Sequence, residues 1–88
     1  MSWKIRVSSD VEKYYRKLDK KLRKRIRDSL FNLSERENPL EHPQVKALTG
    51  DLRGFYRLRV GNYRIIFALV EESKMIAVVN IFPRGDAY

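Results

Sequence analysis

The pair Gly61-Asn62 is the feature that most constrains how this chain can fold, because apolar and polar residues alternate on both sides of it. Gly-Asn pairs suit the two-residue turns that join antiparallel strands, since glycine adopts a positive φ without strain. The pattern therefore predicts a β-hairpin in which Val60 and Tyr63 pair across the turn. In that register Arg59 lies directly opposite Arg64.

The same register separates the arginines of the hairpin from its apolar side chains. Arg57, Arg59 and Arg64 point to one face. The residues that point to the other face, toward the helices, are Tyr56, Leu58, Val60, Tyr63, Ile65, Phe67 and Leu69. Like charges directly opposite on a sheet destabilise it by a few tenths to about 1 kcal/mol, so local stability does not account for the cluster. An ordinary solvated surface and a binding site for an anionic partner both remain open on these residues alone.

The first third of the chain has the patterns of one strand and two helices. Apolar and charged residues alternate over residues 3–7, which predicts a half-buried strand. Ser9-Asp10-Val11-Glu12 has the spacing of a capping box at the start of a helix that reaches to about Leu18. Asp19 can cap a second helix, and the short link between the two predicts an antiparallel helical hairpin.

Both predicted helices carry apolar residues at helical spacing. These core stripes are Val11, Tyr14, Tyr15 and Leu18 in the first helix, and Leu22, Ile26, Leu30 and Leu33 in the second. Phe31 falls on the opposite side of the second stripe, where it either packs under the following loop or marks a partner surface. The basic run Lys20 to Arg27 is typical of a solvated helix face, although it could also grip a phosphate-rich surface.

The predicted element order is β-α-α-β-β-β, an α+β fold with the helical hairpin packed on one face of a mainly antiparallel sheet and the opposite face partly open. Residues 36–54 have loop chemistry with a short extended piece around Val45 to Leu48. The later strands are predicted over Phe55 to Val60, Tyr63 to Val70 and Met75 to Phe82. With 88 residues, 43% of them hydrophobic, the chain makes one domain over 1–88.

Composition narrows the class of partner. Nineteen Lys and Arg against eleven Asp and Glu give a net charge of +8, which favours an anionic partner such as nucleic acid. The absence of cysteine excludes disulfides and suits a reducing compartment. No long apolar run is present, so we expect a cytoplasmic protein without a membrane partner. His42 stands alone, and no motif predicts a metal or cofactor.

RNA cleavage is a chemistry that arginines alone can assist, because the substrate's own 2′-hydroxyl can attack the adjacent phosphate. Guanidinium groups would stabilise the developing charge, and Arg84, just after the last predicted strand, adds a fourth to the three of the hairpin. Arginine is a poor base because its pKa lies above 12. Tyr88 could move a proton if cations depressed its pKa, stack under an unpaired base, or simply fold against the sheet.

The segment Leu48 to Phe67 and the terminal Pro83-Arg84-Gly85 resemble the RelE superfamily of toxin–antitoxin toxins, and the resemblance extends over essentially the whole chain. The short Pro-Arg-Gly ending is most similar to archaeal RelE proteins. The resemblance implies a metal-independent endoribonuclease that cuts mRNA in the ribosomal A site. It also implies a RelB-like antitoxin that wraps around the toxin, and we expect no homo-oligomer of the free toxin.

Matching by motif carries the family's roles onto particular residues. The expected catalytic residues are Arg64, Arg84 and Tyr88, and the expected substrate-binding residues are Arg57, Arg59 and Lys46. ParE-like toxins share this fold but act on DNA gyrase and lack the basic cluster, so the four arginines favour the nuclease. A non-catalytic RNA-binding module also stays open, because no acid–base pair is evident.

Overall fold

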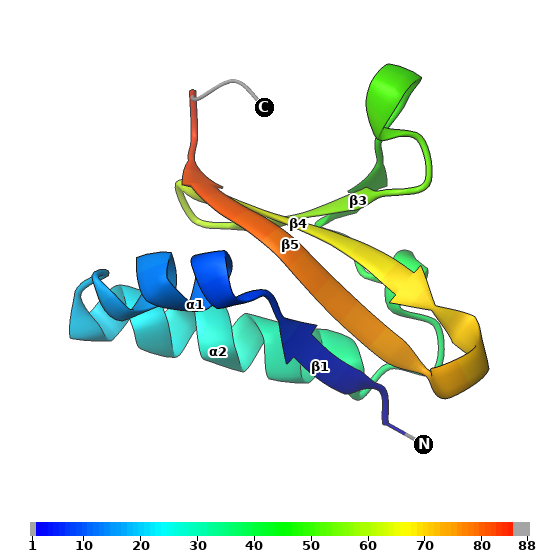
Figure 1. The fold of residues 1–88 in the computed structure, drawn as a ribbon. Helices are drawn as coiled ribbons and strands as arrows, with labels where there is room; N and C mark the ends of the chain where they lie inside the picture. The colour runs from blue at the N-terminus through cyan, green and yellow to red at the C-terminus, as the bar shows by residue number, and fades with distance from the viewer. Residues whose placement is uncertain (1, 86–88) are drawn as a thin grey trace.

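A computed structural model describes residues 2–85 of the chain. Its strands and helices are β1 (Lys4–Val7), α1 (Ser9–Arg16), α2 (Lys20–Ser34), β2 (Val45–Ala47), β3 (Tyr56–Val60), β4 (Tyr63–Val70) and β5 (Met75–Pro83), with short 3-10 turns at Pro39–Glu41, Gly50–Leu52 and Glu71–Ser73. The strands form one sheet in the order β1-β5-β4-β3-β2, in which β1 runs parallel to β5 and all other neighbours are antiparallel. Both helices lie on one face of the sheet, which confirms the predicted α+β fold (Figure 1).

The extended piece predicted around Val45 to Leu48 becomes the edge strand β2. It pairs antiparallel with β3, with Lys46 opposite Arg57 and Val45 opposite Leu58. The sheet therefore has a fifth strand beyond the four in the predicted element order. This strand brings Lys46 beside the hairpin that carries the arginines.

The first helix begins one residue earlier than its predicted cap. Ser8, with extended backbone at φ −64° and ψ 156°, is the N-cap, and its side-chain oxygen accepts a hydrogen bond from the Val11 N–H at 3.3 Å. The prediction that Ser9 caps this helix was wrong. Glu12 consequently does not complete a capping box, and instead forms an exposed ion pair with Arg16 at 2.8 Å.

The second helix follows its prediction closely. Asp19 caps it, with Oδ1 accepting a hydrogen bond from the Leu22 N–H at 2.8 Å. Its apolar stripe enters the core between the helices and the sheet. The side chains that are fully buried there include Ile26, Leu33, Leu58, Ile65, Phe67, Ile76 and Val78.

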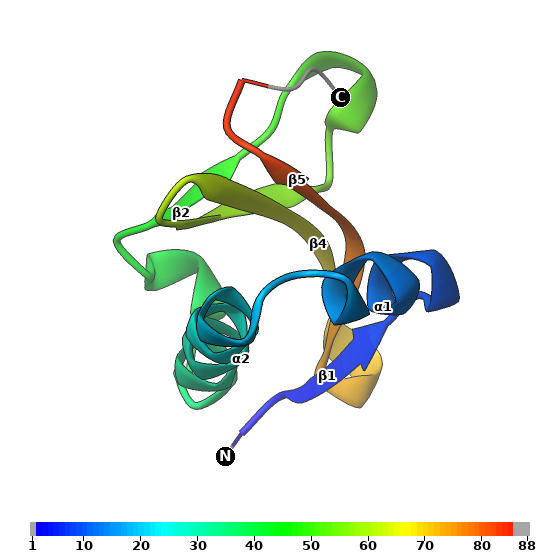
Figure 2. The same cartoon turned by 90° about the vertical axis from the view of Figure 1, so that its left-hand side faces the viewer.

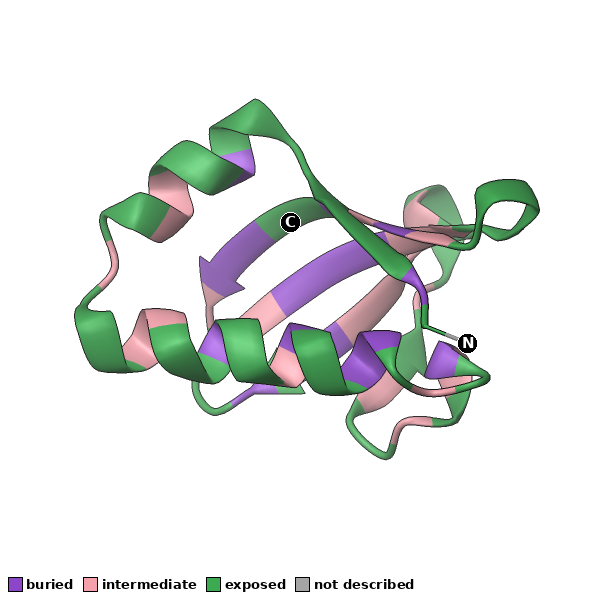
Figure 3. Cartoon of the chain, turned by 90° about the horizontal axis from the view of Figure 1, so that it is seen from below, coloured by how far each residue is buried: buried purple, intermediate pink, exposed green. Residues whose placement is uncertain are grey.

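The strand β1 is more exposed than its alternating pattern predicts. Ile5 and Val7 keep 38% and 36% of their surface exposed, although Trp3 just before them is buried. The reason is that α1 and α2 diverge from the link between them and leave the sheet visible in the gap, with β1 along its border (Figures 2 and 3). The apolar side chains of β1 thus line a groove instead of filling the core.

A β-bulge at Val79 interrupts the pairing of β4 with β5. Ile66 pairs with Asn80 and Phe67 pairs with Val78, so Val79 has no opposite residue on β4. Such a bulge places two residues of one strand against one of its neighbour and bends the bulged strand. Side chains of β5 therefore change their alternation at this point.

The change of alternation decides which side chains of β5 reach the open face. Before the bulge Ile76 and Val78 are buried on the helix side, and after it Ile81 takes that side. Phe82 is paired with Arg64 and so shares its face. In an unbroken strand of this sequence, residues 82 and 84 would follow 76 and 78 onto the helix side. The bulge therefore brings Phe82 onto the face of Arg64, and the chain reaches Arg84 two residues later.

Candidate functional site

The sheet face away from the helices carries four cationic residues, Lys46, Arg57, Arg59 and Arg64, and we name these four, together with Arg84 just after β5, the arginine face. Lys46 and Arg57 are paired on β2 and β3, and Arg59 and Arg64 are paired on β3 and β4. Paired residues share a face, with Cβ atoms about 4.5–5.5 Å apart. Neighbouring rows along a strand lie about 7 Å apart. The fold thus brings these charges within reach of a short stretch of phosphodiester backbone.

The predicted hairpin turn is confirmed, and it organises one end of this face. Val60 pairs with Tyr63, and Gly61 has the positive φ of 55° that the turn requires. The Arg64 side chain is half-buried and donates from Nη1 to the carbonyl oxygens of Tyr63 at 3.3 Å and Gly61 at 3.5 Å. These contacts hold the guanidinium beside the turn.

Arg84 is attached to the same turn from the end of β5. Its backbone N–H donates to the carbonyl oxygen of Asn62, and its side chain is exposed. Pro83, just before it, pairs with Tyr63 across the strands. Two of the expected catalytic residues, Arg64 and Arg84, therefore meet at one turn although they lie twenty positions apart in the chain.

The arginine face is partly apolar. Ile66 and Phe82 lie on it, keep only 3% and 8% of their surface exposed and lie outside the main core, so the face is only partly open, as predicted. Arg57, paired with Ile66, is half-buried, and its Nε is buried with no hydrogen-bond acceptor among residues 2–85. A buried donor without an acceptor is costly. An anion bound here would meet that donor in partly desolvated surroundings, where ionic attraction is stronger than in water.

Carboxylates do not neutralise this surface within the described part of the chain. The two ion pairs found there, Glu12 with Arg16 and Lys24 with Asp28, are exposed and lie within the helices. Arg57, Arg59 and Arg84 have no carboxylate within ion-pair distance among residues 2–85. The arrangement can therefore attract and orient an anion, and guanidinium groups present forked donors that match phosphate oxygens.

Tyr88 and His42 were also considered as site residues from the sequence. Tyr88 lies outside the described residues, so its role stays a prediction. His42 accepts a hydrogen bond at Nδ1 from the Gln44 N–H at 3.0 Å, and burial together with the nearby Arg36 charge lowers its pKa. No group of side chains in residues 2–85 has the makeup of a metal site. None of the helices in that range is both long and apolar enough to cross a membrane.

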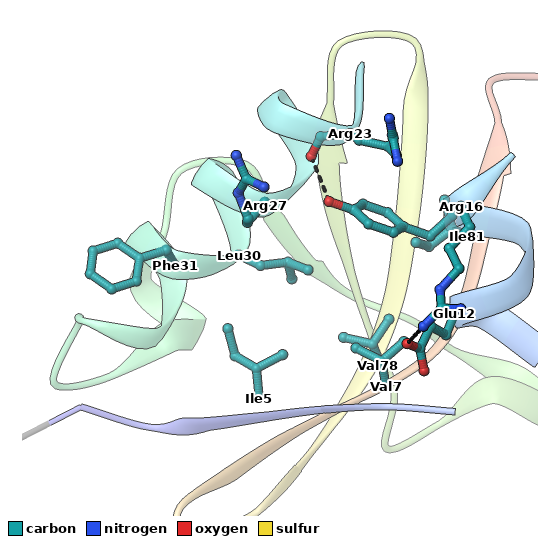
Figure 4. A pocket seen from close by; sticks show the side chains of 11 residues that line it. Ile5, Val7, Glu12, Arg16, Arg23, Arg27, Leu30, Phe31, Val78 and Ile81 are labelled. Atoms are coloured by element: carbon teal, nitrogen blue, oxygen red, sulfur yellow. Dashed lines mark hydrogen bonds and ion pairs between the residues drawn. The ribbon is translucent and has the colours of Figure 1, made fainter. Parts of the chain in front are cut away.

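A second surface, which the sequence did not predict, is the groove between the two helices and β1. Figure 4 shows its apolar residues, which include Ile5, Val7, Leu30, Val78 and Ile81, with arginines Arg16, Arg23 and Arg27 around them. Tyr15 closes one end by donating to the Arg23 carbonyl at 2.9 Å. Phe31 lies at the border with 62% of its surface exposed, so it does not pack under the following loop.

Comparison with known proteins places this chain and its fold in a recognised class. Residues 2–88 match the family model described as the ParE toxin of the type II toxin–antitoxin system parDE. The toxin of the archaeal RelE–RelB complex from Pyrococcus horikoshii is 29% identical, with a TM-score of 0.79 over 99% of this chain and 100% of that one. No curated protein sequence matches the chain significantly.

Two further structures share the fold at lower identity. The RelBE2 toxin–antitoxin complex of Mycobacterium tuberculosis contains a chain that is 22% identical, with a TM-score of 0.83 over 98% of this chain and 95% of that one. The isolated RelE toxin of Escherichia coli is 18% identical, with a TM-score of 0.73 over 98% and 88%. The class is thus that of the small toxins of type II toxin–antitoxin systems. The chain belongs to the RelE/ParE superfamily of these toxins.

Proposed function

We propose that this toxin is a ribosome-dependent endoribonuclease that cuts mRNA in the ribosomal A site, within the cytoplasm. The observation that supports the proposal is the arginine face, in which four cationic residues from β2, β3 and β4 share one side of the sheet and Arg84 is joined to the hairpin turn beside them. Proteins that act on gyrase through this fold are expected to lack such a cluster. The resemblance to archaeal RelE points in the same direction.

In the proposed reaction the 2′-hydroxyl oxygen of the substrate attacks the adjacent phosphorus, and the bond to the 5′-oxygen breaks. The hydroxyl proton leaves to a base and the departing 5′-oxygen gains a proton, so that the products are a 2′,3′-cyclic phosphate and a 5′-hydroxyl. Arg64 and Arg84 stabilise the pentavalent phosphate, whose negative charge exceeds that of the ground state. Arg57, Arg59 and Lys46 bind and orient the flanking backbone, and Tyr88 stacks on a base.

Mapping mRNA ends after incubation with translating ribosomes tests the proposal. Wild-type protein should cut within the A-site codon. Arg64→Ala and Arg84→Ala should abolish cutting, because each removes a charge that stabilises the pentavalent phosphate, and should leave the fold intact, because both residues lie off the core. Arg27→Ala removes a cation from the helix groove and should cut normally. Full activity in both Arg64→Ala and Arg84→Ala would remove their proposed roles.

We also propose a cognate RelB-like antitoxin as the inhibitory partner, because several similar structures are toxin–antitoxin complexes. The helix groove combines apolar residues with three arginines, which fits the apolar and acidic sides of an amphipathic segment. The partner should be encoded beside this gene. If the complex were no more stable at low salt than at high salt, the electrostatic part of this proposal would be wrong.

Inhibition of DNA gyrase is the second candidate function, favoured by the ParE description of the matching family model. A supercoiling assay separates the two candidates. Intact mRNA together with inhibited supercoiling would support the gyrase function. Cut mRNA with unaffected supercoiling would support the nuclease.

A further inference from the structure

The side chain of Arg25 crosses from the helical layer to the hairpin turn. A Cβ atom added to Gly61 would lie 2.9 Å from Nη1 and 3.0 Å from Nη2 of Arg25. The guanidinium therefore rests against the side of Gly61 where any other residue would carry its side chain. This contact joins the middle of α2 to the turn between β3 and β4.

Three arginines from separate elements thus converge on the Gly61-Asn62 turn. Arg25 contacts Gly61 from α2, Arg64 donates to the Gly61 carbonyl from β4, and Arg84 donates its backbone N–H to Asn62 from the end of β5. Like charges gathered in this way repel one another, and a phosphate placed among them would relieve that repulsion. A phosphate bound at the turn would therefore lie near guanidinium groups from both α2 and β4.

Arg25 differs from its basic neighbours on α2. Lys24 is paired with Asp28 at 3.1 Å, and Arg23 and Arg27 line the helix groove. Arg25 is exposed and has no hydrogen bond or ion pair with any residue in the 2–85 range. Its charge is thus available at the turn, whereas those of its neighbours are engaged or directed elsewhere.

We propose that Arg25 is a further RNA-binding residue, whose guanidinium contacts a backbone phosphate of the strand held on the arginine face. It extends the phosphate-binding surface around the Gly61-Asn62 turn onto α2. The inference deepens the proposed function and rests on it, because it assumes that the strand lies across Arg64 and Arg84. The proposal gives one residue of the basic run Lys20 to Arg27 a specific binding role, whereas the sequence alone indicates a solvated helix face.

Affinity for a single-stranded RNA, measured across salt concentrations with the whole chain, tests this role. Uniform 2′-O-methylation of the RNA removes the attacking hydroxyl, so binding is measured without cleavage. Arg25→Gln should weaken binding about 5- to 10-fold at low salt and reduce the slope of log affinity against log salt by about 0.7, the value for one lost contact to a single strand. Arg25→Lys should keep most of that slope. Arg27→Gln, one groove arginine on the same helix, is the matched control and should bind like wild type.

The outcomes separate this inference from the proposed function. If Arg64→Ala weakens binding and Arg25→Gln does not, the role of Arg25 is overturned while the arginine face stands. Equal losses in Arg25→Gln and Arg27→Gln would also overturn it, because the effect would be one of net charge alone. Wild-type protein that does not bind the RNA would overturn the role of Arg25, whereas ribosome-dependent cleavage is decided separately by the mapping of mRNA ends. Circular dichroism confirms that each variant is folded before its affinity is compared.

Discussion

Arg59 and Arg64 are directly paired across the hairpin of β3 and β4, so that two guanidinium-bearing side chains leave the sheet side by side. Their Cα atoms are about 4.5–5.5 Å apart in such a pairing. Repulsion between the two guanidinium groups opposes folding, whereas a bound phosphate would be attracted to both of them. Removing one charge of the pair should therefore increase stability and weaken phosphate binding, and a substitution at a single residue can test both effects.

Arg59→Gln should raise the free energy of unfolding by a few tenths to about 1 kcal/mol at low salt, because it removes one of two like charges placed opposite each other. The same change should weaken RNA binding. Urea unfolding at low and high salt measures the effect, and the gain should shrink as salt screens the pair. Unchanged stability at low salt would show that the two guanidiniums already avoid each other.

Ser8→Ala should lower the free energy of unfolding by about 1 kcal/mol, because the Ser8 side chain caps α1 by accepting from the Val11 N–H. Ser9→Ala is the matched control, since Ser9 is already inside the helix, and it should cost much less. Thermal or urea unfolding compares the two variants. A larger loss of stability in Ser9→Ala than in Ser8→Ala would show that Ser9 is the cap.

Phe31→Ala should leave the free energy of unfolding within about 0.5 kcal/mol of wild type, because the ring is 62% exposed. Leu30→Ala, at the adjacent position, removes a side chain that is only 7% exposed and should cost about 2–5 kcal/mol. Phe31→Ala should nevertheless weaken the antitoxin complex if the partner occupies the helix groove. Calorimetry of the toxin with its antitoxin measures this, and an undiminished affinity would place the partner elsewhere.

The folded chain should lose stability as the pH falls below about 6.5, the ordinary pKa of histidine. Burial and the Arg36 charge lower the pKa of His42 in the folded chain. Below 6.5 the unfolded chain therefore binds a proton that the folded chain does not, and the loss ends below the folded pKa. His42→Gln should flatten this part of the profile when urea unfolding is followed against pH. A profile that stays equally steep would assign the loss to other groups.

The hairpin register could be predicted because the Gly61-Asn62 turn signal and the period-two pattern of the adjacent residues agree. The Asp19 cap was also predicted correctly, because capping depends only on residues close together in the sequence. Ser8 and Ser9 are neighbours with equal capping ability, so the sequence alone could not choose between them. The edge strand β2 has only three residues, and its place in the sheet depends on pairing with β3.

The parts of the site that could not be predicted depend on tertiary structure. Nothing in the run around Val79 marks a bulge, yet the bulge sets the face on which Phe82 lies. The contact between Arg25 and Gly61 depends on where α2 crosses the sheet. The helix groove likewise follows from the divergence of two helices that each have an ordinary apolar stripe.

The strand order also gives the two ends of the arginine face different local stabilities. β5 lies between β1 and β4, whereas β2 is an edge strand of three residues. Edge strands open more readily than central ones, so amide hydrogens around Lys46 should exchange with solvent sooner than those around Ile81. If the face binds RNA as proposed, its Lys46 end can then adjust to the backbone of different sequences, while Arg64 is held on a strand that has neighbours on both sides.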